Sequence, residues 1–250
     1  MKFLFYLLLI SSYSFAGTNL LLIGGGNRPP EAMKEFIKLS GSDNAQILIF
    51  PWASGSIQSA EAIKAELSQH AKAKFTIIPH ELNSVDVKKL MTQILNGSGI
   101  FFTGGDQNTL MSFINKYEIK TLLQKRYQEG VVFGGTSAGT AIMSDQMLSG
   151  SGDLSVIDGS QIELTQGLGL LPANVIVDQH FVVRQRFNRL AGVILQKENT
   201  IGIGVDENTA FLIQNNTGRV IGPSQVLIFE KLSLDKLTIT VLSSGKSFSF

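Results

Sequence analysis

The chain has 250 residues, of which 44% are apolar, with 25 glycines and six prolines. A chain of this length and composition can bury one sizeable core, which predicts a single globular domain and gives no sign of disorder. The formal net charge of +1 gives no electrostatic reason to expect a nucleic-acid partner, and the absence of cysteine excludes help from disulfide bonds.

Residues 1–16 have the layout of a secretory signal peptide. Lys2 precedes an apolar stretch over residues 3–10, and small and polar residues then lead to Ala16. The apolar run is less than half of the roughly 20 residues that a membrane-spanning helix needs, so no stable membrane anchor is expected. We predict cleavage after Ala16, a secreted or periplasmic protein, and one globular domain over residues 17–250.

Apolar runs of strand length then alternate with segments of helical period. This alternation predicts a three-layer α/β fold, in which helices cover both faces of a mostly parallel sheet. The predicted strands cover residues 20–24, 47–51, 75–79, 99–103, 131–133, 175–178 and 201–205. The predicted helices cover residues 30–39, 59–70, 85–95, 108–129 with a break, 138–144 and 184–196. Short strands at residues 210–213, 219–221, 225–230 and 237–242 predict a small antiparallel extension of the same domain.

The most informative segment is VVFGGTSAGTAIMS, in which a strand ends in Gly-x-Ser-x-Gly and a helix follows. This is the pattern of a nucleophile elbow, whose tight turn exposes Ser137 above the sheet while the glycines let neighbouring backbone approach closely. The Ala138 N–H then lies at a helix N-terminus, where it can stabilise an oxyanion. A phosphate-binding turn is the alternative, but the lysine of a P-loop is missing.

A nucleophilic serine needs a base, and histidine is the usual one. Of the three histidines, His70 falls on a charged helix. His80 ends an early strand and is not excluded. His180 follows a later strand at its carboxyl end, where open α/β sheets place reacting groups, so we favour it over His80.

The third member should be a carboxylate that orients the imidazole. Glu207, at the carboxyl end of the strand in IGIGVDENTA, fits this role. In an Asp-Glu pair one acid commonly only caps a turn, so position alone does not decide between them. The rivals of Glu207 are Asp206, Asp178, Asp153 and Asp158.

Two glycine-rich loops and three arginines complete the candidate site. The loops at residues 24–26 and 104–107 each follow a strand, so they are expected at the sheet edge that carries Ser137, although either loop can be a plain close-approach turn. A backbone N–H of the second loop is a candidate oxyanion donor. The arginines, spaced too unevenly to share one helix face, are candidates for gripping an acidic substrate group or for forming surface ion pairs: Arg184, Arg186 and Arg189.

These residues resemble the cyanophycinase branch of the peptidase S51 family, which is related to the aspartyl dipeptidases. The matching stretches, spread from residue 21 to residue 210, are LLIGGG, FFTGGDQ, GGTSAGTAIMSD, GLGLL, VDQHFVVRQRFNRL and GIGVDENTA. The tract DQHF with its three spaced arginines is the specific one, since other branches share the serine elbow. The chain departs from the family pattern at Thr140, where alanine is usual, and in a short C-terminal region.

The resemblance implies a class I glutamine-amidotransferase-like α/β fold with a catalytic triad of Ser137, His180 and Glu207. It implies an oxyanion hole formed by the backbone N–H groups of Gly105 and Ala138. It also implies that six residues shape the substrate pocket: Gln107, Asp178, Gln179, Arg184, Arg186 and Arg189.

The resemblance further implies an exported serine exopeptidase that releases β-Asp-Arg dipeptides from the aspartyl-arginine polymer cyanophycin through an acyl-enzyme on Ser137. Two alternatives stay open: an aspartyl or isoaspartyl dipeptidase acting on small aspartyl peptides, and a catalytically silent binding protein on the same fold. No metal or cofactor is predicted, because no cluster of His, Asp and Glu has ligand spacing. The assembly, with a homodimer as one alternative, is left open.

Overall fold

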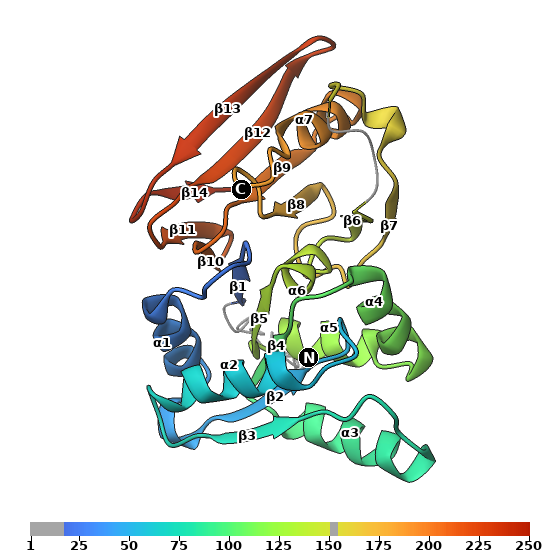
Figure 1. The fold of residues 1–250 in the computed structure, drawn as a ribbon, viewed down its shortest axis with the longest axis vertical. Helices are drawn as coiled ribbons and strands as arrows, with labels where there is room; N and C mark the ends of the chain where they lie inside the picture. The colour runs from blue at the N-terminus through green and yellow to red at the C-terminus, as the bar shows by residue number, and fades with distance from the viewer. Residues whose placement is uncertain (1–17, 151–154) are drawn as a thin grey trace, which may run out of the picture.

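The computed structural model describes residues 18–150 and 155–250, so the predicted signal peptide and Asp153 lie outside the described residues. Its larger sheet has eight strands in the order β14-β11-β10-β1-β5-β4-β2-β3 (Figure 1). The parallel strands are β1 (Asn19–Ile23), β2 (Gln46–Phe50), β3 (Lys74–Ile77), β4 (Gly99–Phe102) and β5 (Val132–Thr136). The antiparallel strands are β10 (Ala210–Gln214), β11 (Thr217–Ile221) and β14 (Ser247–Ser249). The predicted fold class is confirmed.

A second sheet has four strands in the order β13-β12-β9-β8. Its members are β8 (Val175–Gln179), β9 (Ile201–Val205), β12 (Val226–Ser233) and β13 (Lys236–Leu242), and a separate hairpin pairs β6 (Gln146–Leu148) with β7 (Leu164–Gln166). The placement of residues 175–178 and 201–205 in the main sheet is thus corrected. The reason is that β10 pairs with β1 along its whole length, which leaves β8 and β9 no free edge there.

The buried apolar residues form three cores, each between helices and a sheet. One core lies between the main sheet and the helices α1 and α2, and a second between its other face and α3, α4, α5 and α6. The third core lies between α7 and the second sheet (Figure 1). The helices are α1 (Pro30–Leu39), α2 (Gln58–Ser68), α3 (Ser84–Asn96), α4 (Gln107–Lys116), α5 (Lys120–Gln128), α6 (Ala138–Ala141) and α7 (Phe187–Gln196), with 3-10 turns at Ser42–Asn44 and Gly159–Gln161. Across residues 18–150 and 155–250, no helix has the length and apolar character to cross a bilayer.

One expected helix agrees with the structure and another differs from it. The helix over residues 108–129 breaks as predicted, because Glu118 has a φ of 54°, a left-handed conformation that no helix continues through. The helix expected over residues 184–196 begins only at Phe187. The residues before it form tight turns, in which Gln185 has a φ of 53°.

The two sheets meet where their parallel strands end, and backbone hydrogen bonds join them there. The His180 N–H donates to the Gly24 carbonyl at 2.6 Å, and the Asn208 N–H donates to the Gly25 carbonyl at 2.9 Å. The Ser144 hydroxyl, beyond α6, accepts the Val177 N–H at 2.9 Å. The carboxyl ends of β1, β5, β8 and β9 therefore converge on one place, which is where open α/β sheets bind ligands.

Candidate active site

Ser137 occupies a strained turn between β5 and α6. Its φ of 52° and ψ of −114° are unusual for a residue with a side chain, and its N–H donates to the Ile23 carbonyl at 3.0 Å. The glycines on either side allow close backbone contact. A Cβ on Gly135 would lie 2.2 Å from the Gly139 carbonyl oxygen, and one on Gly139 would lie 2.3 Å from the Phe102 carbonyl oxygen. The G-x-S-x-G spacing is therefore a packing requirement of this elbow.

Ser137, His180 and Glu207 form one chain of hydrogen bonds. The His180 Nε2 lies 2.8 Å from the Ser137 Oγ, and its Nδ1 lies 2.5 Å from the Glu207 Oε1. The serine comes from the main sheet, whereas the histidine and the glutamate follow β8 and β9 of the second sheet. This is the geometry of a nucleophile, a general base and a carboxylate that orients the base.

The surroundings of His180 favour its neutral form. Burial lowers the pKa of the imidazole below its usual 6.5, the hydrogen bond to Glu207 opposes this shift, and the positive charges of Arg184 and Arg186 add to it. A neutral imidazole whose Nδ1–H is directed at a carboxylate leaves Nε2 free to accept the serine proton. The site thus contains a base that is unprotonated at neutral pH.

The other base and acid candidates have partners elsewhere. The His80 Nε2 lies 2.6 Å from the Ser54 carbonyl oxygen. Asp206 accepts backbone N–H groups of the loop after His180, Asp158 accepts the Ser160 N–H at the start of a 3-10 turn, and Asp178 pairs with arginine. Five acids were candidates for the third member, and the structure describes four of them. Among these four, Glu207 is the acid that contacts the imidazole.

The two glycine loops lie beside this chain of hydrogen bonds. Gly25 packs against the imidazole so closely that a Cβ on Gly25 would lie 2.1 Å from the His180 Cε1. A Cβ on Gly104 would lie 3.3 Å from the Ser137 Cβ, so the loop after β4 lies against the nucleophile. Gly105, with a φ of 144°, belongs to this loop, and Ala138 is the first residue of α6. Ala138 thus directly follows the serine, and Gly105 directly follows the glycine that lies against it.

The three arginines after His180 have separate environments. The Arg184 side chain is 52% exposed, and its Nε lies 3.9 Å from the Glu207 Oε1, so its charge is available at the mouth of the site. Arg189 is only 2% exposed and grips the buried Asp178 with two nitrogens, one of them Nε at 2.7 Å from Oδ2. In this conformation the Arg189 donors are directed at Asp178.

Arg186 joins the same buried pair. Its Nη1 donates to the Gln179 carbonyl at 2.7 Å and lies 3.5 Å from Asp178. Burial lowers the pKa of its guanidinium to about 10, against the attraction of Asp178. A buried carboxylate and two guanidiniums thus support the base of the loop that carries His180.

The two glutamines of the expected pocket are also buried. The Gln107 side-chain amide donates to the Leu148 carbonyl at 2.9 Å. The Gln179 Oε1 has no hydrogen-bond partner within the described residues, although the atom is inaccessible to solvent. A buried polar atom without a partner is uncommon, so Gln179 is the residue of this set with unused hydrogen-bonding capacity.

The sequence profile described as Peptidase family S51 matches residues 20–221, a range that contains every site residue described above. The chain belongs to peptidase family S51. This S51 chain is 30% identical over 254 residues to a cyanophycinase from Trichormus variabilis, with 92% of this chain and 85% of the relative covered. A cyanophycinase from Synechococcus elongatus is 27% identical over 252 residues, with coverage of 92% and 78%. The S51 chain is therefore a serine-type peptidase and a hydrolase.

Solved structures share the fold of this S51 peptidase. A peptidase from an acI-B1 Actinobacterium superposes with a TM-score of 0.70 at 23% identity, covering 94% of this chain and 98% of the other. A putative Peptidase E protein from Listeria monocytogenes gives a TM-score of 0.59 at 14% identity, with coverage of 91% and 100%. At these identities the likeness concerns the fold alone.

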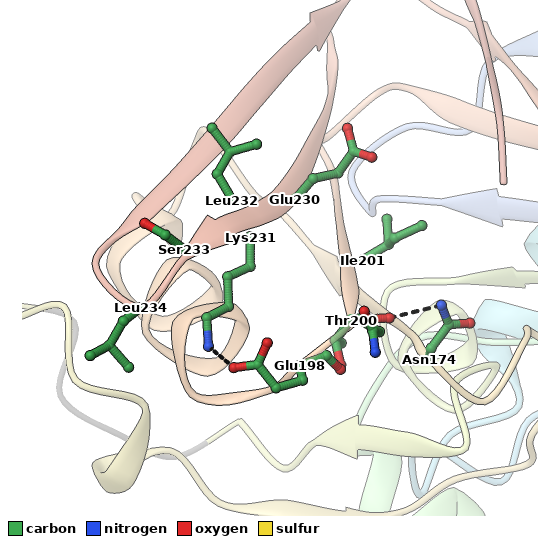
Figure 2. A pocket seen from close by; sticks show the side chains of 10 residues that line it. Asn174, Glu198, Thr200, Ile201, Glu230, Lys231, Leu232, Ser233 and Leu234 are labelled. Carbon is green, nitrogen blue, oxygen red and sulfur yellow. Dashed lines mark hydrogen bonds and ion pairs between the residues drawn. The ribbon is translucent and has the colours of Figure 1, made fainter.

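The S51 peptidase has a pocket of about 400 Å³ beneath the β12–β13 hairpin, at the end of β9 opposite to the triad. Figure 2 shows Lys231 reaching across it to an ion pair with Glu198. Neither a serine–histidine pair nor, in the described residues, a cluster of metal-ligating side chains is present there. The pocket therefore has none of the chemistry found at the elbow.

Thr140 and Asp206 have contacts that sequence reasoning did not assign. The Thr140 hydroxyl accepts the Ile23 N–H at 3.0 Å and lies within 2.8 Å of the carbonyl oxygens of Ile23 and Gly135, so it ties α6 to β1 and β5. Thr140 therefore has a structural role at the elbow. One indication of a role for Asp206 was present in the sequence, namely its position beside Glu207 at the end of a strand.

Proposed function

We propose that this chain is an exported peptidase that hydrolyses cyanophycin to β-Asp-Arg dipeptides through an acyl-enzyme on Ser137. The observation that carries the proposal is the hydrogen-bonded chain of Ser137, His180 and Glu207 in an S51 chain whose relatives are named cyanophycinase. The three groups form one hydrogen-bonded chain where the two sheets meet. A catalytically silent binding protein would have no chemical need for all three, so the chain argues against that alternative.

In the proposed reaction His180 Nε2 takes the Ser137 proton as the Oγ attacks an aspartyl carbonyl carbon. Glu207 holds the imidazole in the tautomer that this step requires and stabilises the imidazolium that forms. The N–H groups of Gly105 and Ala138 donate to the oxyanion. The imidazolium then protonates the leaving amine, and a water molecule, deprotonated by His180, hydrolyses the acyl-enzyme.

Charge at the mouth of the site suits an acidic substrate unit. Arg184 is exposed and lies beside Glu207, where a guanidinium can pair with the free carboxylate that each arginine unit of the polymer carries. The buried Arg186 and Arg189 support the same loop. We assign Arg184 the direct contact with substrate, and we assign the shaping of the pocket to the buried residues Gln107, Asp178, Gln179, Arg186 and Arg189.

The export of the protein belongs to the same proposal. A signal peptide cleaved after Ala16 would deliver the domain of residues 17–250 to the periplasm or the medium, where an insoluble polymer must be attacked by an exported enzyme. Mass spectrometry of the protein recovered from outside the cytoplasm should give an N-terminus at Gly17. Light scattering of the same sample tests the homodimer.

The deciding experiment incubates the protein from residue 17 onward with purified cyanophycin granules. Soluble β-Asp-Arg is assayed by mass spectrometry, with Ser137→Ala as the inactive control. Release by the parent alone supports polymer hydrolysis through this serine. If neither protein releases dipeptide but the parent splits short aspartyl or isoaspartyl peptides, the dipeptidase alternative replaces the cyanophycin proposal. If the parent cleaves nothing and no serine probe labels it, the binding-protein alternative stands.

A further inference from the structure

Asp206 is a buried carboxylate that forms no ion pair within the described part of the chain. Its side chain is 3% exposed. Its Oδ1 accepts the N–H groups of Val182 at 2.9 Å and Val183 at 3.1 Å, and its Oδ2 accepts the Ser224 hydroxyl at 2.6 Å. A buried anion is tolerated only where hydrogen bonds replace its hydration. Two of its three donors belong to the turn that follows His180.

That turn has a defined shape. The Arg184 N–H donates to the His180 carbonyl at 3.0 Å, so residues 180–184 form one helical turn. The first N–H groups of such a turn have no partner inside it. Asp206, the residue that follows β9, supplies this partner in the way that an N-cap side chain does at the start of a helix.

The turn also begins in an unfavourable conformation. His180 has a φ of 51°, which residues with a side chain rarely adopt unless the surroundings hold them there. The hydrogen bond from its N–H to Gly24 fixes one side of the residue. On the other side the Phe181 N–H donates to the Val205 carbonyl at 3.3 Å, and Asp206 holds the two peptide N–H groups that follow it. Without Asp206 the turn could relax and carry the imidazole away from Ser137.

Asp206 and Glu207 act on the same turn at two levels. Glu207 binds the His180 side chain, and Asp206 binds the backbone that carries it. We propose that Asp206 is a positioning residue, which fixes the turn of residues 180–184 so that the imidazole meets Ser137 and Glu207 at the same time. The proposal rests on the catalytic roles of Ser137 and His180 given above, but not on the identity of the substrate.

Three variants separate positioning from mere stability. Asp206→Ala removes all three hydrogen bonds. Asp206→Asn keeps an Oδ1 that can accept both N–H groups, and its amide can still donate to Ser224. Ser224→Ala is the matched control, because it removes only the hydroxyl at Oδ2 and leaves the two bonds to the turn.

The readouts do not depend on cyanophycin. A fluorophosphonate that reacts with activated serines gives kinact and KI for Ser137, and proton NMR detects the strongly downfield Nδ1–H of His180 beside Glu207. Thermal melts fix a working temperature at which every variant is folded. If the granule assay shows that cyanophycin is not the substrate, this test can still be carried out and interpreted.

Asp206→Ala is expected to lower kinact about a hundredfold with KI unchanged, because about 1 Å of displacement of a catalytic group costs a factor of this size. The downfield proton should disappear. Asp206→Asn should stay within about fivefold of the parent and keep that proton, since neutral hydrogen bonds replace charged ones of the same geometry. Ser224→Ala should leave kinact unchanged, whatever its melting temperature.

The proposal is overturned if folded Asp206→Ala keeps the parent kinact, or if Asp206→Asn is as slow as Asp206→Ala, which would mean that the charge and not the hydrogen bonds matters. If Asp206→Ala does not fold, Asp206→Ser takes its place, since its shorter hydroxyl cannot bridge both peptides. A kinact for Asp206→Ser well below that of Asp206→Asn supports the proposal, and a value equal to the parent's refutes it.

Discussion

The two ends of strand β9 carry regions of very different character. Its carboxyl end leads into Asp206 and Glu207, where backbone strain, a nucleophile and a base converge. Its amino end borders the pocket of Figure 2, which contains the ion pair of Lys231 with Glu198. This second region is hollow, yet only the first region holds groups that can react with one another. A cavity alone is therefore a poor guide to the site in this fold.

The backbone shows the same contrast. Beside the pocket of Figure 2, Asn199 has a positive φ, and asparagine tolerates this left-handed conformation. At the triad, Ser137 and His180 have a positive φ although their residue types adopt it less readily. Strain held by neighbouring structure is characteristic of functional sites. The predictions below test whether activity belongs to one end of β9 alone.

The largest effect is expected for Ser137→Ala. The rate of hydrolysis should fall by about five orders of magnitude or more, because the nucleophile and the function of its base are lost together. Granule assays and active-site titration measure this loss. Ser112→Ala, which removes an exposed hydroxyl on α4, is the control and should leave the rate unchanged. Comparable rates for both variants would disprove the role of Ser137.

Glu207→Gln should have the next largest effect. An amide at this position keeps the shape but cannot stabilise the imidazolium, so kcat should fall by about 10³–10⁴-fold with the fold intact. Glu198→Gln makes the same chemical change at the other end of β9 and should leave kcat unchanged. Equal losses in the two variants, or a fully active Glu207→Gln, would remove the distinction between the two regions.

The pH dependence of kcat/KM should be set by His180. Activity is lost as pH falls through the pKa of this imidazole, which burial places below 6.5, so the acid limb should have its midpoint below pH 6.5. Arg184→Gln removes a cation that lowers this pKa, and its acid limb should therefore move to higher pH. Arg219→Gln, an exposed arginine on β11, should not move it. A shift of the Arg184→Gln limb to lower pH would contradict the assignment.

The smallest effect is expected at the pocket of Figure 2. Lys231→Met replaces a side chain that is 6% exposed, while its partner Glu198 is 78% exposed and largely screened by solvent. The free energy of unfolding should change by no more than about 1 kcal/mol, with kcat and KM unchanged. Chemical denaturation and the granule assay check both parts. A loss of activity without loss of stability would show that this end of β9 also contributes to the reaction.

The sequence predicted the parts of the molecule that local patterns encode. The elbow around Ser137 follows from a strand-turn-helix pattern, and the choice of His180 as base follows from its position at the end of a strand. Partners in sheets do not follow from such patterns. Strand periodicity gave no sign that β8 and β9 form their own sheet, because this depends on β10 reaching the edge of β1 from far along the chain.

The arginines show the same limit at the level of side chains. In the sequence Arg184, Arg186 and Arg189 differ only in spacing, yet one is exposed beside Glu207 and another is buried against Asp178. The difference arises because α7 begins at Phe187, after the turns that follow His180. Burial of a charge depends on this tertiary path, which no single-sequence pattern specifies.

The pairing of β1 with β10 has a consequence for how the protein matures. Asn19 and Gln214, paired across these strands, are 195 positions apart in the chain, so this contact closes one of the longest loops in the molecule. Such non-local pairings form slowly. Glu207 lies between β9 and β10, whereas Ser137 follows β5 beside β1. The triad therefore requires segments from both ends of the domain to be brought together, and the β1–β10 pairing is one of the contacts that join these ends.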